Sequence, residues 1–276
     1  MKKILLGTNL LFILMAMNAQ EFCGKVLSSN KKSPVEFANI GIIGKNRGTV
    51  SDEKGKYTLN IKGILDKDTI RISKIGYKPV TMTVNQFKSL TVPDIYLSPQ
   101  KYQLPEIKII GKNKMKMYGE PVPTSKLNHV FGNSYGVLWL GQELGSLIDV
   151  KKKVLIREIN INIGECSFDS VQLRLNIYKA NKNGKFHNIL KEPIYFSFTK
   201  DEIKKVIAIN VTKDSILIKN EVLISVEYYK HLGKGHLGFF AKNTPFKETF
   251  FRNSPEAPWK TSPGKLGLYL YGEVAK

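Results

Sequence analysis

The sequence predicts an all-β protein of two β-sandwich domains, and three observations lead to this prediction. Apolar and polar residues alternate in short runs along most of the chain, which is the two-residue period of strands with one buried face. Clusters of turn-forming residues separate these runs. No stretch carries the 3.6-residue period of a long helix. The 276 residues are enough for two domains of roughly 100 to 200 residues each.

The N-terminus has the features of a secretory signal peptide. Lys2 and Lys3 precede an apolar run over residues 4–17, and the small residue Ala19 follows. A spanning helix needs about 20 apolar residues, and this run is shorter. We therefore predict that residues 1–19 are a signal peptide cleaved between Ala19 and Gln20. The mature chain would be an exported protein of the periplasm, the outer membrane or the cell surface.

The charge indicates which partners to expect. The chain has a formal net charge of +20, and only five of its 43 basic residues are arginines. Nucleic-acid-binding proteins favour arginine and cluster their charge on one stripe, whereas these lysines are scattered. We expect a solvated, lysine-rich surface and an envelope protein or a surface glycan as the partner, and no nucleic acid.

Residues 20–98 are predicted to form the first sandwich. Strands are expected at 22–27, 36–43, 56–61, 69–73, 80–84 and 91–97. Asp52 is expected to accept backbone hydrogen bonds within its own turn, and Gly55 to supply the positive φ that the turn needs. The alternative for Asp52 is a calcium ligand, for which Glu53 is the one further acid at hand.

Four motifs in this segment carry a family resemblance. They are GKV at 24–26, PV at 34–35 with ANI at 38–40, GTVSDEKGKY at 48–57, and IGY at 75–77. In order and spacing they resemble the carboxypeptidase regulatory-like domain, a transthyretin-like sandwich of exported Bacteroidetes proteins, over residues 21–98. The resemblance implies an accessory domain without catalytic residues.

Residues 99–126 are predicted to be a basic, proline-containing linker. Its segment LPEIKII at 104–110 resembles the extended segment that follows this domain in TonB-dependent outer-membrane transporters. The roughly 150 residues that remain are too few for such a barrel. The resemblance thus implies, as an alternative function, an accessory component of a TonB-dependent uptake system. The segment is also suited to add as a strand to a partner's sheet.

Residues 127–276 are predicted to form a second, jelly-roll-like β-sandwich. Alternation is clearest at 159–163 and 171–178, and further runs lie at 194–198, 206–211, 222–228, 237–241 and 266–271. About eight strands are expected, with a hairpin turn at 181–184. This half resembles β-sandwich regions of unknown function attached to regulatory-like domains, so the fold assigns no activity.

One motif suggests catalysis. GNSYG at 132–136 fits the G-x-S-x-G nucleophile elbow around Ser134, and Asp201 or Asp214 and then His231 or His236 follow in the order of an α/β-hydrolase. An elbow needs a strand before it, a helix after it and a parallel sheet around it, which this sequence does not predict. We expect no enzyme and no catalytic residue. A serine hydrolase using Ser134 is the alternative.

Other candidate site residues are few. His231 and His236 flank a short loop without a third ligand nearby, so neither a metal nor a cofactor is expected. Trp259 lies in a proline-rich loop, where it either contacts a ligand or closes the end of the core. The function predicted is that of a non-catalytic binding or scaffolding protein of the cell envelope, with a partner protein favoured over a glycan.

Trp139 and the two cysteines are expected in the interior. Trp139 lies in the apolar run 137–140. Cys23 and Cys166 would lie in different domains, so they form either a cross-domain disulfide or two separate buried thiols. The second arrangement is favoured, because a free cysteine packs well as a small apolar group.

Overall fold

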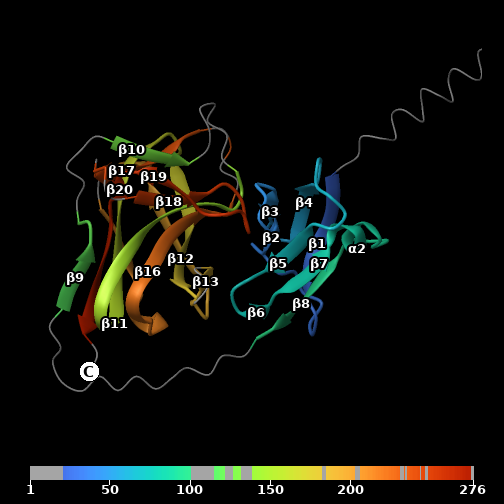
Figure 1. Cartoon of the computed structure of the whole chain (residues 1–276), viewed down its shortest axis with the longest axis horizontal. Helices are drawn as coiled ribbons and strands as arrows, with labels where there is room; N and C mark the ends of the chain where they lie inside the picture. Colours follow the sequence, from blue (N-terminus) through green and yellow to red (C-terminus); the bar gives the residue numbers. More distant parts are fainter. Residues whose placement is uncertain are drawn as a thin grey trace, which may run out of the picture.

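The computed structural model describes residues 21–100, 115–121, 127–131, 139–181, 185–202, 206–230, 233, 235–242, 244–245 and 248–274, and the structural statements below concern these residues. The chain forms two bodies that lie side by side (Figure 1). We call residues 21–100 the N-terminal body and residues 115–274 the C-terminal body. Nearly all described elements are strands, so the all-β prediction is confirmed.

The N-terminal body is a sandwich of two four-stranded sheets. In spatial order, one sheet contains β4 (Lys56–Asn60), β1 (Glu21–Ser28), β8 (Ile95–Pro99) and β6 (Tyr77–Lys78). The other contains β3 (Gly48–Val50), β2 (Asn39–Ile42), β5 (Thr69–Ser73) and β7 (Val80–Thr83). Ile40 and Ile72 of one sheet and Leu59 and Leu97 of the other belong to one buried cluster. The alternation along each strand supplies these residues from a single face.

A short helix that the sequence analysis did not predict follows β7. It is α2 (Val84–Lys88), where a strand was expected to continue through Val84. The Thr83 hydroxyl accepts a hydrogen bond from the Gln86 amide at 3.1 Å, and the Gln86 side chain accepts one from the Thr83 amide at 2.9 Å. This reciprocal pair is a capping box. Val84 and Phe87 enter the core from the helix.

The Asp52 turn is formed as predicted. Asp52 Oδ1 accepts hydrogen bonds from the amides of Lys54 and Lys56, each at 2.8 Å. Gly55 has φ +72°, and a Cβ there would lie 2.5 Å from the Val26 carbonyl oxygen. The carboxylate oxygen of Asp52 therefore serves its own turn, and Gly55 is required by both backbone conformation and space.

The C-terminal body is one continuous thirteen-stranded sheet around a single hydrophobic cluster. Its strands are β9 (Met115–Gly119), β10 (Leu127–Phe131), β11 (Gln142–Cys166), β12 (Ser170–Ala180), β13 (Phe186–Asn188), β14 (Ile194–Thr199), β15 (Val206–Asn210), β16 (Leu217–Tyr228), β17 (Leu237–Lys242), β18 (Glu248–Arg252), β19 (Lys260–Pro263), β20 (Lys265–Leu266) and β21 (Leu268–Val274).

The 25-residue strand β11 organises this body. It pairs antiparallel with β15, β16, β17, β18 and β21. Its register shifts between 150 and 154, between 156 and 158, and between 163 and 165. Such irregularities bend and twist a strand, which lets β11 curve around the core.

Two expectations differ from the structure. The described residues of this body form thirteen strands rather than about eight. The segment 99–126, predicted to be a linker, contains β9, which pairs with β21 and places Tyr118 against the core cluster. Met115 and Met117 on its other face are exposed. An edge strand that buries one side chain has little apolar alternation, which explains why its sequence resembles a linker. The segment 104–110 lies outside the described residues.

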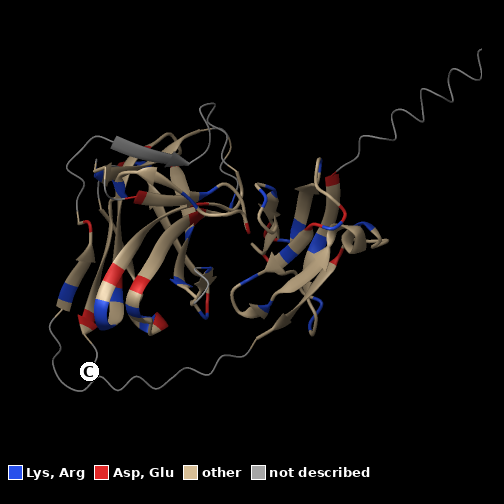
Figure 2. Cartoon of the chain, viewed as in Figure 1, with Lys and Arg blue, Asp and Glu red and all other residues tan. Residues whose placement is uncertain are grey.

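Lysine and arginine residues occur on many elements of both bodies (Figure 2). The hairpin expected near 181–184 joins β12 to β13, which pair antiparallel. The residues at its described ends are joined by a hydrogen bond of 2.8 Å from the Asn181 amide to the Lys185 carbonyl oxygen.

In the described ranges, no helix is long and apolar enough to span a bilayer.

Candidate functional site

A row of side chains crosses the outer face of the C-terminal sheet where this sheet meets the N-terminal body. The strand register places Arg252 (β18) opposite Glu143 (β11), Glu143 opposite Glu227 (β16), Glu227 opposite Arg174 (β12), and Arg174 opposite Tyr195 (β14). We call the four charged residues the charged row. Two carboxylates directly opposite each other destabilise a sheet, so an arginine on each outer side is needed to balance them.

Each carboxylate of the charged row is paired with one arginine. Arg174 Nε lies 2.8 Å from Glu227 Oε2, and its Nη2 lies 2.6 Å from Oε1. Arg252 Nε lies 2.9 Å from Glu143 Oε1, and its Nη2 contacts the same oxygen. Both glutamates are 0% exposed, while the two arginine side chains are 3% and 10% exposed. The charged row is therefore a buried, charge-balanced set.

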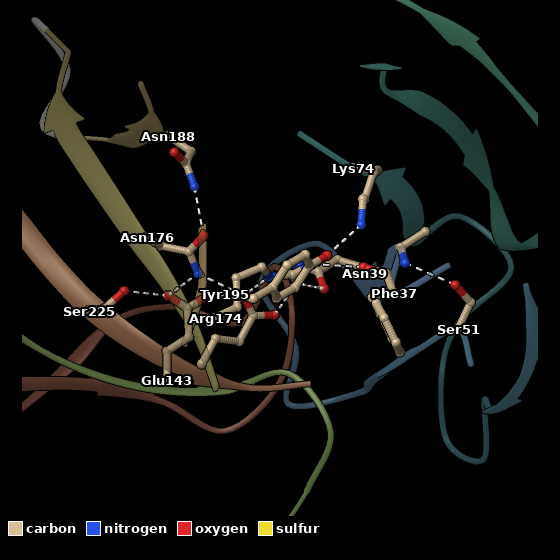
Figure 3. Close-up of polar contacts among 12 residues, drawn as sticks. Phe37, Asn39, Ser51, Lys74, Glu143, Arg174, Asn176, Asn188, Tyr195 and Ser225 are labelled. Atoms are coloured by element: carbon tan, nitrogen blue, oxygen red, sulfur yellow. Dashed lines mark hydrogen bonds and ion pairs between the residues drawn. The ribbon is translucent and has the colours of Figure 1, made fainter. Parts of the chain in front are cut away.

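Neutral donors occupy the remaining acceptor positions. Ser225 Oγ donates to Glu143 Oε2 at 2.6 Å, and the Tyr178 hydroxyl lies 3.1 Å from both oxygens of Glu143. Asn176 Nδ2 lies 2.6 Å from Glu227 Oε2. It also lies 3.3 Å from Glu143 Oε2 (Figure 3). Each carboxylate oxygen thus accepts a hydrogen bond from within the protein, as buried polar groups require.

Burial and charge act differently on the two carboxyls. Burial raises the pKa of Glu143, and the opposing effects of Arg252 and Ser225 do not cancel it. Burial also acts to raise the pKa of Glu227, but the charge and hydrogen bonds of Arg174 outweigh it, so this pKa lies below its usual range. Glu227 is therefore the carboxylate held most firmly in its charged form, with Arg174 as its counterion.

Arg174 also connects the charged row to the N-terminal body. Its Nη1 donates to the Phe37 carbonyl oxygen at 2.7 Å, and its Nη2 donates to Asn39 Oδ1 at 2.6 Å (Figure 3). Next to it, Lys74 of the N-terminal body donates to the Tyr195 hydroxyl at 2.7 Å. One guanidinium thus neutralises a buried carboxylate and binds the other body.

The Phe37 loop is shaped to meet Arg174. Phe37 has φ +52°, a conformation that a bulky residue adopts only where its surroundings hold it. Its ring packs edge to face on Tyr229, with centroids 4.6 Å apart, and on Tyr195 at 5.9 Å. The buried Ser51 hydroxyl accepts a hydrogen bond from the Ala38 amide at 2.8 Å. Contacts from both bodies therefore hold this loop.

Loop 253–258 of the C-terminal body makes a second connection. A Cβ on Gly41 would lie 2.2 Å from the Pro255 carbonyl oxygen, and a Cβ on Gly141 would lie 2.2 Å from Pro255 Cδ. Only glycine leaves room for this approach. Glu256, the next residue, accepts from Arg71 Nη1 at 3.0 Å. The charged row and this loop together hold the two bodies against each other, and we call this region the joint.

A cleft of about 250 Å³ lies at the joint. Asn39, Arg71 and Lys74 line it from the N-terminal body, and Arg174, Asn176 and Arg252 are among its lining residues from the C-terminal body. A second hollow of about 600 Å³ adjoins it, because Gln100 and Leu190 line both. The polar lining makes the cleft the candidate binding site of the described chain.

Lys74 has an unusual environment in this cleft. Burial lowers the pKa of its ammonium to about 7, and the neighbouring Arg174 charge acts in the same direction. Glu36 and Glu227 act in the opposite direction but do not restore the usual value. Near neutral pH, Lys74 is therefore divided between its charged and its neutral form.

The two tryptophans differ from each other in placement. Trp259 is half-buried, with its ring edge to face against Tyr178 at 5.7 Å and the Arg252 guanidinium 4.8 Å from its centroid. It covers one end of the charged row and is not among the residues that line the cleft. Trp139 is 42% exposed, so its predicted core position is wrong. It lies in the turn before β11, where Leu140 instead packs against the core.

The residues of the possible hydrolase are partly outside the described chain. Ser134 and His231 lie outside the described residues. Asp201 lies in the 3-10 turn η2 (Lys200–Glu202), Asp214 lies in η3 (Thr212–Asp214), and His236 is exposed just before β17. Among the described side chains, no group of three or more His, Cys, Asp or Glu is arranged to hold a metal.

Ala19 and Gln20, between which signal-peptide cleavage is predicted, also lie outside the described residues. Both cysteines are free thiols, so they are separate, as favoured. Cys23 is exposed, so the prediction that it is buried is wrong. It lies near the start of β1, where its sulfur is 3.4 Å from the Thr58 hydroxyl of the neighbouring strand β4. Cys166 is half-buried, and burial raises the pKa of its thiol.

The N-terminal body resembles a known domain family. Residues 22–109 match the CarboxypepD_reg-like domain family. The match confirms the resemblance that the motifs indicated and spans β1 to β8. The CarboxypepD_reg-like domain therefore supplies the Phe37 loop, Asn39 and Lys74 to the joint. Among curated proteins, none matches the chain.

Solved structures with some likeness include two of infectious bursal disease virus. The structure of its Gx strain has a TM-score of 0.19 and 8% identity, with coverage of 93% of this chain and 64% of that chain. The structure of its VP2 subviral particle has a TM-score of 0.18, with the same identity and coverage. The chain thus spans less than two thirds of their length. A TM-score this low carries no argument about fold or function.

Proposed function

We propose that this protein is a non-catalytic, exported binding or scaffolding protein of the bacterial cell envelope, whose two bodies act as one unit toward a partner protein. The observation that carries the proposal is the joint. Arg174, buried in the C-terminal body, makes hydrogen bonds to Phe37 and Asn39 of the other body. A partner would then meet a surface composed of both bodies in a fixed arrangement.

The environment of the buried carboxylates supports a structural use. A general acid or base has to reach the proton that it transfers, directly or through one water. Glu143 and Glu227 are fully buried, and their oxygens are occupied by Arg252, Arg174 and neutral donors. Such groups are suited to orient strands and bodies, because breaking a buried ion pair is costly.

The sequence supports the location. Lys2 and Lys3 with the apolar run after them have the order of a signal peptide. The N-terminal body matches the CarboxypepD_reg-like domain over residues 22–109. The resemblance stated above associates this domain with exported proteins, in which it is an accessory.

Capture of a partner by variants of the joint tests the proposal. The mature chain would be immobilised and incubated with detergent-solubilised envelope. The double variant Arg174→Met, Glu227→Gln removes the contacts to Phe37 and Asn39 while it keeps the charged row balanced. A partner that recognises the fixed arrangement should be lost from the double variant and retained by Arg157→Met, which removes a pair outside the joint.

Two results would contradict the proposal. Equal capture by the double variant and the control would show that the fixed arrangement is not what the partner recognises. Hydrolysis of an activated ester that disappears in Ser134→Ala would show a serine hydrolase instead. The location is tested by the mass of the exported chain. It should begin at Gln20, and an intact Met1 or a lipid on Cys23 would refute this.

A further inference from the structure

We propose that the cleft at the joint is a binding site for a small carboxylate-bearing ligand, with Lys74 as the cation that receives the carboxylate. This inference goes beyond the scaffolding role and does not depend on it. Lys74 lines the cleft from the N-terminal body, beside Arg174 and Tyr195 of the C-terminal body. The site would therefore be completed only where the two bodies meet.

Lys74 differs from the other cations in the cleft in its partners. Four lysines and arginines line the cleft, and three of them are paired with a carboxylate: Arg71 with Glu256, Arg174 with Glu227, and Arg252 with Glu143. Within the described part of the chain, Lys74 has one hydrogen bond, to the Tyr195 hydroxyl, and no ion pair. An ammonium has three donors, so two remain for a ligand.

The charges around Lys74 favour an anion next to it. Arg174 repels the charged form of Lys74, and Glu227, which would attract it, is already paired with Arg174. Glu36 also attracts the ammonium, yet the pKa remains at about 7. A carboxylate bound at Nζ would supply the missing opposite charge and raise this pKa again. Ligand binding and proton uptake by Lys74 are therefore coupled.

The size and the neutral lining narrow the ligand class. The cleft volume of about 250 Å³ is below the roughly 300 to 1,000 Å³ of sites for drug-sized ligands. It suits a single sugar acid or a single amino acid. Asn39, Ser73 and Asn188 offer neutral polar groups along the wall. Both sources share the carboxylate, and the experiment separates them.

Isothermal titration calorimetry of the mature chain at pH 8 tests the site. The probes are glucuronate and N-acetylglutamate, with neutral glucose as the matched control for the first and inorganic phosphate as a different anion. Each titration is run in two buffers with different ionisation enthalpies. Because Lys74 is mostly neutral at pH 8, carboxylate binding should take up a proton, and the measured heat should change with the buffer.

Variants connect this signal to Lys74. Lys74→Met should weaken binding about tenfold or more, as expected for loss of a charge-assisted hydrogen bond, and should abolish proton uptake. Lys78→Met, at an exposed position of strand β6, is the control and should change neither the affinity nor the proton uptake. If Lys74→Met fails to fold, Lys74→Arg serves in its place. It should bind without proton uptake, because arginine stays charged.

The outcomes separate clearly. Binding of glucuronate alone supports the site and identifies a sugar acid, and binding of N-acetylglutamate alone supports it and identifies an amino acid. Binding of both supports the shared carboxylate chemistry. The proposal is overturned if neither binds at about 10 mM, if phosphate binds as tightly as the carboxylates, or if proton uptake persists in Lys74→Met.

Discussion

Substitution of Arg174 by methionine tests the energetic role of the charged row. Methionine retains an unbranched aliphatic side chain but removes two hydrogen bonds to Glu227, one to Phe37 and one to Asn39. Among the described residues, Glu227, which is 0% exposed, would keep Asn176 as its one hydrogen-bond donor. Removal of one partner from a buried ion pair costs about 3 to 5 kcal/mol, because the other charge stays buried and unpaired. We expect a loss of unfolding free energy in that range.

The matched control is Arg157→Met. Arg157 makes the same two-bond pair with Glu273, at 2.9 and 3.2 Å, but both side chains are 20% exposed. Pairs near the surface contribute about 0 to 1 kcal/mol. Urea unfolding of the chain from residue 20 onward, followed by circular dichroism, gives the unfolding free energy of both variants. Arg174→Met should be the less stable by at least about 2 kcal/mol.

Two further measurements make the test specific. Adding Glu227→Gln to Arg174→Met removes the unpaired charge and should recover part of the loss. In Arg174→Met alone, the unpaired Glu227 should have a raised pKa. As the pH falls, the folded variant therefore binds a proton at a higher pH than the unfolded chain does. The difference in unfolding free energy between the wild type and Arg174→Met should therefore become smaller from pH 8 to pH 5. The reasoning is refuted if Arg174→Met costs no more than Arg157→Met, or if the second substitution recovers nothing.

Three other predictions follow from the joint and the sequence. The pKa of Lys74 is about 7 in the folded chain against 10.5 ordinarily, so the unfolded chain binds more protons between these values. The unfolding free energy should rise with pH in this window, more in the wild type than in Lys74→Met, and equal slopes would contradict this. Gly41→Ala should cost about 1 to 3 kcal/mol and expose loop 253–258 to proteases, because its Cβ meets the Pro255 carbonyl; an unchanged digest and melt would be the opposing result. Ser134→Ala should leave the rate of ester hydrolysis unchanged, which a kinetic assay measures. It should change the unfolding free energy by no more than about 0.5 kcal/mol, which a melt measures.

The sequence predicts the N-terminal body well because its signals are local. Residues 69–73 form the strand expected there, and the Asp52 turn has the predicted hydrogen bonds and the positive φ at Gly55. A turn depends on four or five consecutive residues, and a strand depends on its own alternation. The capping box of α2 is also local, as Thr83 and Gln86 are three residues apart. Its helix is too short to show a helical period.

The charged row could not be predicted in the same way. On β11, β12 and β16, the residues Glu143, Arg174 and Glu227 alternate with core residues such as Leu144. Alternation assigns them to the outer face of a sheet, and an outer face is normally solvated. Here the other body covers that face at Arg174, with contacts from residues more than 100 positions away in the sequence. A local pattern contains no information about such a contact.

Arginine use is the signal that could have indicated the row. In this lysine-rich chain, Arg71, Arg157, Arg174 and Arg252 all pair with glutamates. Arginine is the cation suited to planar, two-bond pairs with carboxylates. The scarcity of arginine among the basic residues argues against nucleic-acid binding. The same scarcity also marks the few positions where a lysine would not replace it.

The position of β21 has a consequence for how the C-terminal body folds. This strand, the last described one, lies between β9, the first described strand of the body, and β11. Its Leu270 is opposite Tyr118 of β9 on one side and Ile159 of β11 on the other. Contacts between residues so distant in sequence form slowly, because a long loop has to close first. The hydrophobic cluster therefore cannot be completed before β21 has been synthesised. A chain truncated before Leu268 would leave Ile159 and Ile161 without their neighbours on that side, and it should remain incompletely folded.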